Sequence, residues 1–250
     1  MTGIARQVTL VLATVLTLVM NYLSNALPLF GNSNGQISDS LPNAFTPAGL
    51  TFAVWGPIFL GLAVFAVYQA LPAQRGPRYD RLFWPYLLGN LLNVAWLFAF
   101  QSLNFGISVV IMLLLLGTLI SLYLMVRGLQ PLSGEFWALQ VPASLYLAWI
   151  SVATMANVTA FLVSAGVTAG VLGIGAQLWS ALLVVIAGLV GTFFLLRYRD
   201  YAFAAVLLWA FLGVYLARPD TLLVAVGVIV GAVLVVMAGL RALRHGRMAL

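Results

Sequence analysis

Long apolar runs separated by short polar connections are the main pattern along this chain. A helix needs about 20 consecutive apolar residues to cross the hydrocarbon core of a bilayer. Runs near that length predict membrane-spanning helices over residues 8–27, 48–71, 83–101, 107–126, 136–159, 175–196, 201–217 and 221–240, of which the seventh is the shortest. The pattern therefore predicts an all-α fold, a polytopic membrane helix bundle of about eight transmembrane helices.

The composition supports this interpretation. Of the 250 residues, 64% are hydrophobic and 6% are charged, a balance that a water-soluble domain of this length could not carry on its surface. The chain has no cysteine, and its one histidine is His245. Disulfide frameworks, thiolate nucleophiles and histidine metal clusters are therefore excluded. We expect the lipid bilayer as a partner and no nucleic acid.

The basic residues are all arginine, and their positions orient the predicted helices. If eight helices are threaded through the membrane, only Arg218 falls on one side and every other arginine falls on the opposite side. Cytoplasmic loops carry an excess of arginine and lysine, so both termini are expected in the cytoplasm. The arginines that share this side are Arg6, Arg75, Arg78, Arg81, Arg127, Arg197, Arg199, Arg241, Arg244 and Arg247.

The connection over residues 28–47 is long and polar, rich in Gly, Asn, Ser and Pro, with Asp39 as its single charge. Such a composition predicts an irregular loop or a short turn. A loop of this length can serve as a lid over a cavity, although a plain surface excursion fits equally well. At its end, Thr46 and Pro47 are predicted to be the N-cap and the first residue of the second helix.

No Asp, Glu, Lys, Arg or His lies in the middle of a predicted helix. Because a charge inside the membrane usually marks an ion pathway, this pattern argues against an ion-driven transporter. Glu135, at the inner end of the fifth helix, is the nearest exception, and we expect Arg127 opposite it. Nucleotide-binding and zinc motifs are absent from the sequence, so we predict neither an enzyme, nor a metal site, nor a required cofactor.

Polar and aromatic side chains share one face of the fifth predicted helix. Tyr146, Trp149, Ala153 and Asn157 follow one another at i, i+3, i+7 and i+11, which places them on one side of a helix. Carboxamide and indole groups are costly in hydrocarbon unless they find partners. This face is therefore expected to look into protein or into a cavity rather than into lipid.

The third predicted helix repeats this theme with Asn90, Asn93 and Trp96, and the second helix adds Trp55. If these faces meet, they enclose an apolar chamber with a few hydrogen-bonding groups, which suits a planar, largely apolar ligand with polar edges. The alternative is that the asparagines hydrogen-bond between helices simply to hold the bundle, at about 1 kcal/mol or less per contact. Tryptophans and asparagines on separate helices favour a ligand site.

Three segments carry motifs in an order that is known from one membrane family. They are FTPAGLTFAVWGPIFLGLAVF, with Pro47, Phe52 and Trp55; LNVAWLFAF, with Asn93, Trp96 and Phe100; and YLAWISVATMAN, with Tyr146, Trp149, Ala153 and Asn157. They resemble the second, third and fifth helices of the tryptophan-rich sensory protein family, also called the translocator protein or peripheral benzodiazepine receptor family. Ala48 stands where that family has a second proline, and its Trp-Tyr pair is missing.

This resemblance implies a five-helix translocator-protein-like core over residues 1–163, followed over residues 164–250 by three additional transmembrane helices and a short basic tail. It also implies binding of a tetrapyrrole such as haem or protoporphyrin, or of a sterol-like hydrophobe, for sensing or transport. We expect the protein in the inner (cytoplasmic) membrane of a bacterium. The ligand-binding residues are then Trp55, Asn93, Trp96, Tyr146, Trp149, Ala153 and Asn157.

Two other functions stay open, namely an uncoupled permease or exporter of small amphipaths and a structural subunit of a larger membrane complex. Gly166 with Gly170, and Gly227 with Gly231, have the GxxxG spacing that lets helices approach closely. We expect these pairs to serve packing within the chain, with a homodimer face as the alternative.

Overall fold

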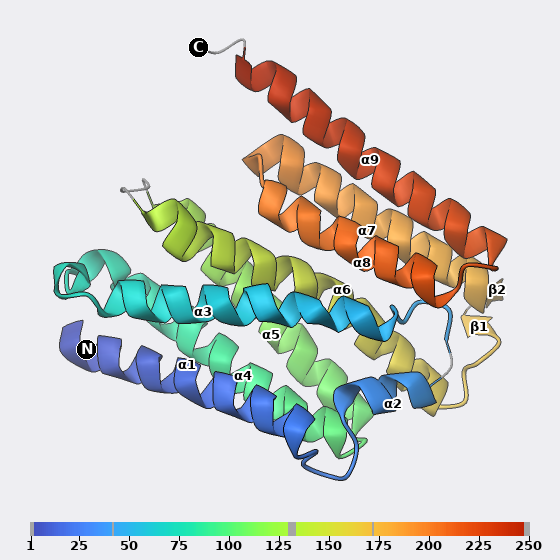
Figure 1. The fold of residues 1–250 in the computed structure, drawn as a ribbon, viewed down its shortest axis with the longest axis horizontal. Coiled ribbons are helices and arrows are strands. Elements are labelled where there is room, and N and C mark those ends of the chain that lie inside the picture. Colours follow the sequence, from blue (N-terminus) through green and yellow to red (C-terminus); the bar gives the residue numbers. More distant parts are fainter. Residues whose placement is uncertain (1–2, 42, 130–133, 172, 248–250) are drawn as a thin grey trace. The chain divides into compact units, whose positions relative to one another are not determined.

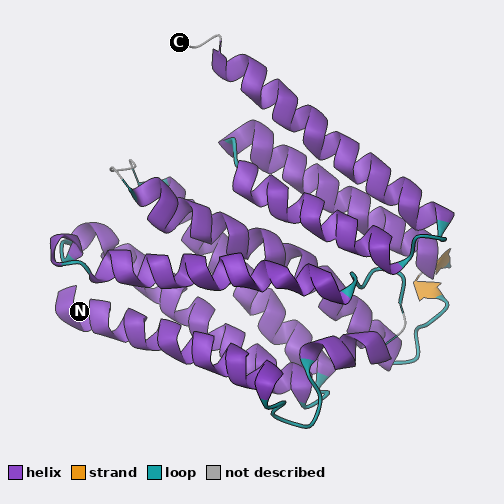
Figure 2. Ribbon diagram, viewed as in Figure 1, coloured by secondary structure: helices purple, strands orange, loops and turns teal. Residues whose placement is uncertain are grey.

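The computed structural model describes residues 3–41, 43–129, 134–171 and 173–247. Most of these residues lie in helices, as Figures 1 and 2 show. The long helices are α1 (Gly3–Ala26), α3 (Trp55–Ala70), α4 (Phe83–Gln101), α5 (Phe105–Arg127), α6 (Val141–Ser164), α7 (Ala176–Tyr198), α8 (Tyr201–Ala217) and α9 (Leu222–Arg247).

The helices confirm the all-α membrane fold that the hydrophobic pattern predicted. Within the described residues, 7 helical segments are long and apolar enough to cross a membrane. The remaining apolar helix, α8, has 17 residues. At about 1.5 Å per residue it rises roughly 25 Å, which is less than the ~30 Å of a typical hydrocarbon core.

Shorter elements join the long helices. Helix α2 (Asn34–Ser40) lies in the first loop, and the 3₁₀ helix η1 (Gly49–Val54) leads into α3. Two more 3₁₀ helices, η2 (Pro72–Gln74) and η3 (Pro77–Leu82), connect α3 to α4, and the π-helical turn η4 (Phe136–Gln140) precedes α6. Between α6 and α7, strand β1 (Gly170–Val171) pairs antiparallel with β2 (Ile174–Gly175).

The first GxxxG pair lies in this connection after α6 and not on a helix. Gly166 has a φ angle of +84° and Gly170 has one of +127°. Residues other than glycine rarely adopt these backbone conformations. The prediction that this pair brings two helices together was therefore wrong. The spacing is the same as in a helix, but these glycines turn the backbone.

The chain divides into two compact units. The first unit comprises residues 1–40 and 55–150, and the second comprises residues 41–54 and 151–250. The boundary falls within α6, so this helix contributes to both units. The sequence division at residue 163 concerns family resemblance rather than packing, and it stays a prediction.

The core of the first unit forms where α1 and α3 pack together and α4 packs on α1 and α5. Tyr86 of α4 lies at its centre, fully buried and stacked on Phe65 at 4.2 Å between ring centroids. The Tyr86 hydroxyl donates to the carbonyl oxygen of Leu62 at 3.0 Å and lies 2.8 Å from the hydroxyl of Thr14. A tyrosine can thus be buried here because its polar atom is hydrogen-bonded.

A buried arginine fastens the start of α1 to the connection between α3 and α4. Arg6 is 1% exposed, and its guanidinium pairs with the carboxylate of Asp80. It also donates to the backbone carbonyls of Gln74 and Gly76. An arginine can stay charged in such a place because several acceptors replace its water shell.

A second ion pair holds the start of the fifth predicted helix. The Glu135 carboxylate, fully buried, accepts from Arg78 Nε at 3.1 Å and Nη2 at 2.8 Å. The Tyr79 hydroxyl donates to the same carboxylate at 2.6 Å. The structure shows an ion pair of Glu135 with Arg78, and the expected position of Arg127 opposite Glu135 stays a prediction.

In the second unit, α7 and α9 approach closely because glycines face each other. A Cβ atom added to Gly227 would lie 2.7 Å from Ala181 Cα, and one added to Gly188 would lie 2.8 Å from Gly231 Cα. Real Cβ atoms do not come so near, so any larger residue would push the helices apart. The pair Gly227 and Gly231 thus serves packing within the chain, as predicted.

Candidate functional site

Three of the predicted site residues meet in the first unit, between α3 and α6. The Trp55 ring lies edge-on to the rings of Tyr146 and Trp149, with centroids 6.0 and 6.3 Å apart, and it stacks on Phe59 at 5.1 Å. Tyr146 and Trp149 are each 2% exposed, while Trp55 is half-buried. These four residues are called the aromatic cluster below.

Local sequence explains why the aromatic cluster forms. Tyr146 and Trp149 lie three residues apart on α6, so both side chains leave the helix on one face. Helix α3 comes close to the start of α6 at Gly61, where an added Cβ would lie 3.1 Å from the Pro142 Cβ. The absence of a side chain at Gly61 therefore permits this approach.

Asn93 of α4 makes the kind of interhelical bond that the alternative interpretation expected. Its Oδ1 accepts from Asn21 Nδ2 of α1 at 2.7 Å, and both carboxamides are buried. Sequence reasoning named Asn93 as a ligand contact and did not pair it with Asn21. Asn21 was visible in the sequence as a polar residue on the first predicted helix. The register of that helix against α4 was not.

Among the buried polar atoms of the first unit that have no hydrogen-bond partner within the described residues are the Tyr146 hydroxyl and Asn90 Oδ1. The carboxamide of Asn93 lies close to the Tyr146 hydroxyl but does not form a hydrogen bond of normal geometry with it. A buried polar atom without a partner costs about 1–3 kcal/mol. Such an atom beside a cluster of aromatic rings could form a hydrogen bond with a polar group of a ligand.

The other predicted site residues lie as follows. Trp96, half-buried, stacks on Phe100 of its own helix at 4.9 Å between centroids. Ala153 and Asn157 continue the α6 face that begins at Trp149, and they belong to the second unit. Asn157 is buried and Ala153 is half-buried. The part that these three residues play in ligand binding stays a prediction.

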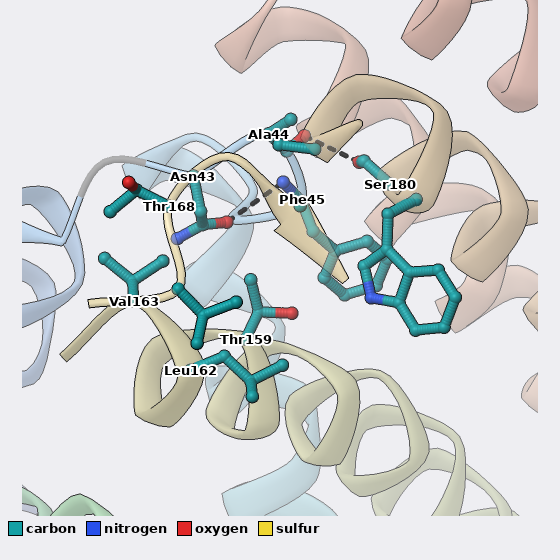
Figure 3. A pocket seen from close by; sticks show the side chains of 12 residues that line it. Asn43, Ala44, Phe45, Thr159, Leu162, Val163, Thr168 and Ser180 are labelled. Atoms are coloured by element: carbon teal, nitrogen blue, oxygen red, sulfur yellow. Dashed lines mark hydrogen bonds between the residues drawn. The ribbon is translucent and has the colours of Figure 1, made fainter. Parts of the chain in front are cut away.

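A small cavity of about 70 Å³ lies in the second unit, beneath residues 43–45 of the first loop. Figure 3 shows Thr159, Leu162 and Val163 of α6 on one side and Ser180 of α7 on another. Pockets for drug-sized ligands usually measure about 300–1,000 Å³. This cavity therefore has room for a few water molecules or a very small ligand, and a tetrapyrrole does not fit in it.

Helix α7 and the residue that follows α8 hold the part of the first loop that covers this cavity. Ser180 Oγ of α7 donates to the carbonyl oxygen of Ala44 at 2.7 Å, as the dashed line in Figure 3 shows. Arg218, after α8, donates through Nη2 to the carbonyl oxygen of Asn43 at 2.8 Å. Sequence reasoning missed both residues, although Arg218 stood out as the arginine on the opposite side from the rest.

Helix α8 bonds to residues 48 and 51, which precede α3. The Ala48 amide donates to the carbonyl oxygen of Gly213 at 2.9 Å, and Trp209 Nε1 donates to that of Thr51 at 2.9 Å. Thr46 Oγ1 accepts from Asn43 Nδ2 at 2.7 Å. Helical structure begins only at Gly49. The predicted N-cap at Thr46 and helix start at Pro47 were thus wrong, because this stretch is engaged with α8 and with its own loop.

Metal-binding groups do not gather anywhere in the described part of the chain, where no three His, Cys, Asp or Glu side chains lie close enough to hold an ion. What the sites offer is aromatic surface, carboxamides and hydroxyls. Such groups can bind and orient an amphipathic molecule.

Comparison with known proteins places the chain in a family. No curated protein and no solved structure matches it. The family model described as TSPO-like protein matches residues 7–241. This match includes the aromatic cluster and also the last three helices, which the motif comparison had left as an addition to the core. The chain therefore belongs to the TSPO-like protein family of membrane proteins.

Proposed function

We propose that this protein binds a hydrophobic or amphipathic ligand, porphyrin-like or sterol-like, for sensing or transport. The observation that carries the proposal is the buried Tyr146 hydroxyl, which has no partner among the described residues and lies within the aromatic cluster. A flat ligand that moved between these rings would meet both apolar surface and a hydrogen-bonding group.

The proposed roles follow from chemistry. Trp55 and Trp149 would form the walls against the flat face of the ligand, and Trp96 would contribute further apolar surface. Tyr146 and Asn93 would hydrogen-bond its polar edge. A bond from Asn93 to a ligand competes with the bond that Asn93 accepts from Asn21, so Tyr146 is the stronger anchor. Ala153 and Asn157 would extend the same face along α6.

The placement in the cell is also a proposal. The arginines at the ends of the predicted spans support cytoplasmic termini by the positive-inside rule, and the inner membrane of a bacterium is the proposed location. Residues 1–163 would hold the ligand. Helix α7 and the turn after α8 would hold the first loop in place, as the bonds from Ser180 and Arg218 indicate.

The proposal can be tested with the purified full-length protein in detergent, titrated with protoporphyrin IX while tryptophan fluorescence is followed. The decisive variant is Tyr146→Phe, which removes only the unpartnered hydroxyl. If the ligand satisfies that hydroxyl, the variant is more stable without ligand by about 1 kcal/mol and binds roughly 5- to 10-fold more weakly. Trp149→Phe is expected to weaken both binding and quenching.

The matched control is Trp84→Phe, which also removes one tryptophan but at a position that is 64% exposed. It is expected to leave the affinity unchanged. Quenching that does not saturate, or equal affinities in all three variants, would contradict the proposal for this ligand. Transport assays with small amphipaths would then be the next measurement.

A further inference from the structure

An open groove runs along α7 and α9 in the second unit, with a volume of about 500 Å³. Its lining is mostly aliphatic, with Leu196 of α7 and Val233 and Met237 of α9, and it ends at Arg241 and Arg244. Below, these residues define the α7–α9 groove. Its surface combines a long apolar part with a strongly cationic end.

The groove has an opening to the surroundings and is not part of the packed core. Met237 is 60% exposed, and Arg241 and Arg244 are exposed as well. The two arginines lie three residues apart on a helix, so their side chains project on the same side. Both guanidinium groups can therefore approach one anionic group.

Further positive charge gathers at the same end of the second unit. Gly239 of α9 lies beside Leu195 of α7, so the end of α7, with Arg197 and Arg199, is level with the Arg241 region. Within the described residues, the acidic side chain at this end is Asp200, which is buried and accepts from the backbone N–H of Phe203 at the start of α8. The four arginines at this end thus outnumber the acidic side chain.

The dimensions match one leaflet of a bilayer. From Val233 to Arg244 the helix rises roughly 16 Å at about 1.5 Å per residue. Half of a hydrocarbon core is about 15 Å thick. An acyl chain that follows the groove from its cationic end would thus reach the middle of the membrane.

We propose that the α7–α9 groove binds one anionic phospholipid. Its phosphate is held by Arg241 and Arg244, and one acyl chain lies along Leu196, Val233 and Met237. A zwitterionic lipid is disfavoured because its ammonium group adds a positive charge next to the arginines, whereas an anionic headgroup is attracted by them. This site is independent of the ligand proposed for the aromatic cluster, because the two lie in different units of the chain.

The test uses full-length protein, stripped of lipid in a neutral detergent and mixed with dioleoyl phosphatidylglycerol or dioleoyl phosphatidylcholine. Native mass spectrometry then counts the lipids that each protein molecule retains. The wild type is expected to retain one phosphatidylglycerol with roughly tenfold preference over phosphatidylcholine. Arg241→Gln/Arg244→Gln is expected to lose this preference.

Two further variants separate a built site from general attraction to charge. Arg75→Gln/Arg81→Gln removes the same number of charges from exposed positions in the first unit, and it is expected to keep the preference. Met237→Trp fills the apolar part at an exposed position and is expected to lower phosphatidylglycerol retention at unchanged charge. Equal losses in the two double arginine variants, retention unaffected by Arg241→Gln/Arg244→Gln, or retention unaffected by Met237→Trp would overturn the proposal.

Discussion

Release of the first loop from α7 and from the turn after α8 is the prediction that the structure supports most directly. The variant Ser180→Ala/Arg218→Gln removes the side-chain donors to the carbonyl oxygens of Ala44 and Asn43, at 2.7 and 2.8 Å. The backbone bond from Ala48 to Gly213 remains. The variant therefore loosens the loop without detaching it.

The burial of the two donors determines how much free energy of local opening the variant loses. Ser180 is buried and its bond to Ala44 is partly buried, and a neutral bond of this kind contributes about 1 kcal/mol. Arg218 is only half-buried, so its charge-assisted bond is worth about 1 kcal/mol rather than the upper end of the range. The loss of about 2 kcal/mol makes local opening roughly 30-fold more frequent.

Hydrogen–deuterium exchange of the purified protein measures this opening directly, because slow exchange in folded segments reports the free energy of local opening. The hydrogen-bonded amides of Phe45, Thr46 and Ala48 are expected to exchange roughly 30-fold faster, while those of α4 keep the wild-type rate. Ser164→Ala is the matched control, since the Ser164 hydroxyl bonds, among the described residues, to the carbonyl of Phe161 in its own helix. Unchanged exchange at residues 43–48 in the double variant would refute the anchoring role.

Two further predictions concern stability. Gly227→Ile places a large side chain where a Cβ would already lie 2.7 Å from Ala181 Cα. Thermal unfolding in detergent should therefore show a free energy of unfolding that is lower by about 1–3 kcal/mol. The control Gly117→Ala, at a position with open space around it, should show no loss of stability. Glu135→Gln removes the charge from a buried, bidentate ion pair and should lower the free energy of unfolding by about 1–3 kcal/mol. An equal free energy of unfolding in this variant and in the exposed control Asp39→Asn would contradict the structural role of Glu135.

The bonds within the second unit show that α7, α8 and the turn after α8 hold the second half of the first loop. Side chains or backbone of α7 and α8, and of the turn after α8, bond to residues 43–51. The first loop had been considered as a lid or as a plain surface excursion. At its second half it is a fastened segment, and a lid motion there would require the loss of several hydrogen bonds.

The sequence by itself determined the class of fold and most helix positions. Apolar run length is a local property, and the length that a bilayer requires is fixed. For this reason the predicted bounds of α4 (Phe83–Gln101) and α8 (Tyr201–Ala217) agree with the structure. The shared face of Tyr146 and Trp149 was also predictable, because the helical repeat fixes directions within one helix.

Only the tertiary structure decided which of these faces and charges meet. Glu135 pairs with Arg78, which is 57 positions away, and Ser180 bonds to Ala44 across 136 positions. Such pairs depend on the rotation and register of packed helices, which composition and spacing leave open. The same holds for Asn93, whose partner Asn21 lies on another helix. Short-range periodicity fixes what one helix presents, and close packing between helices fixes what it contacts.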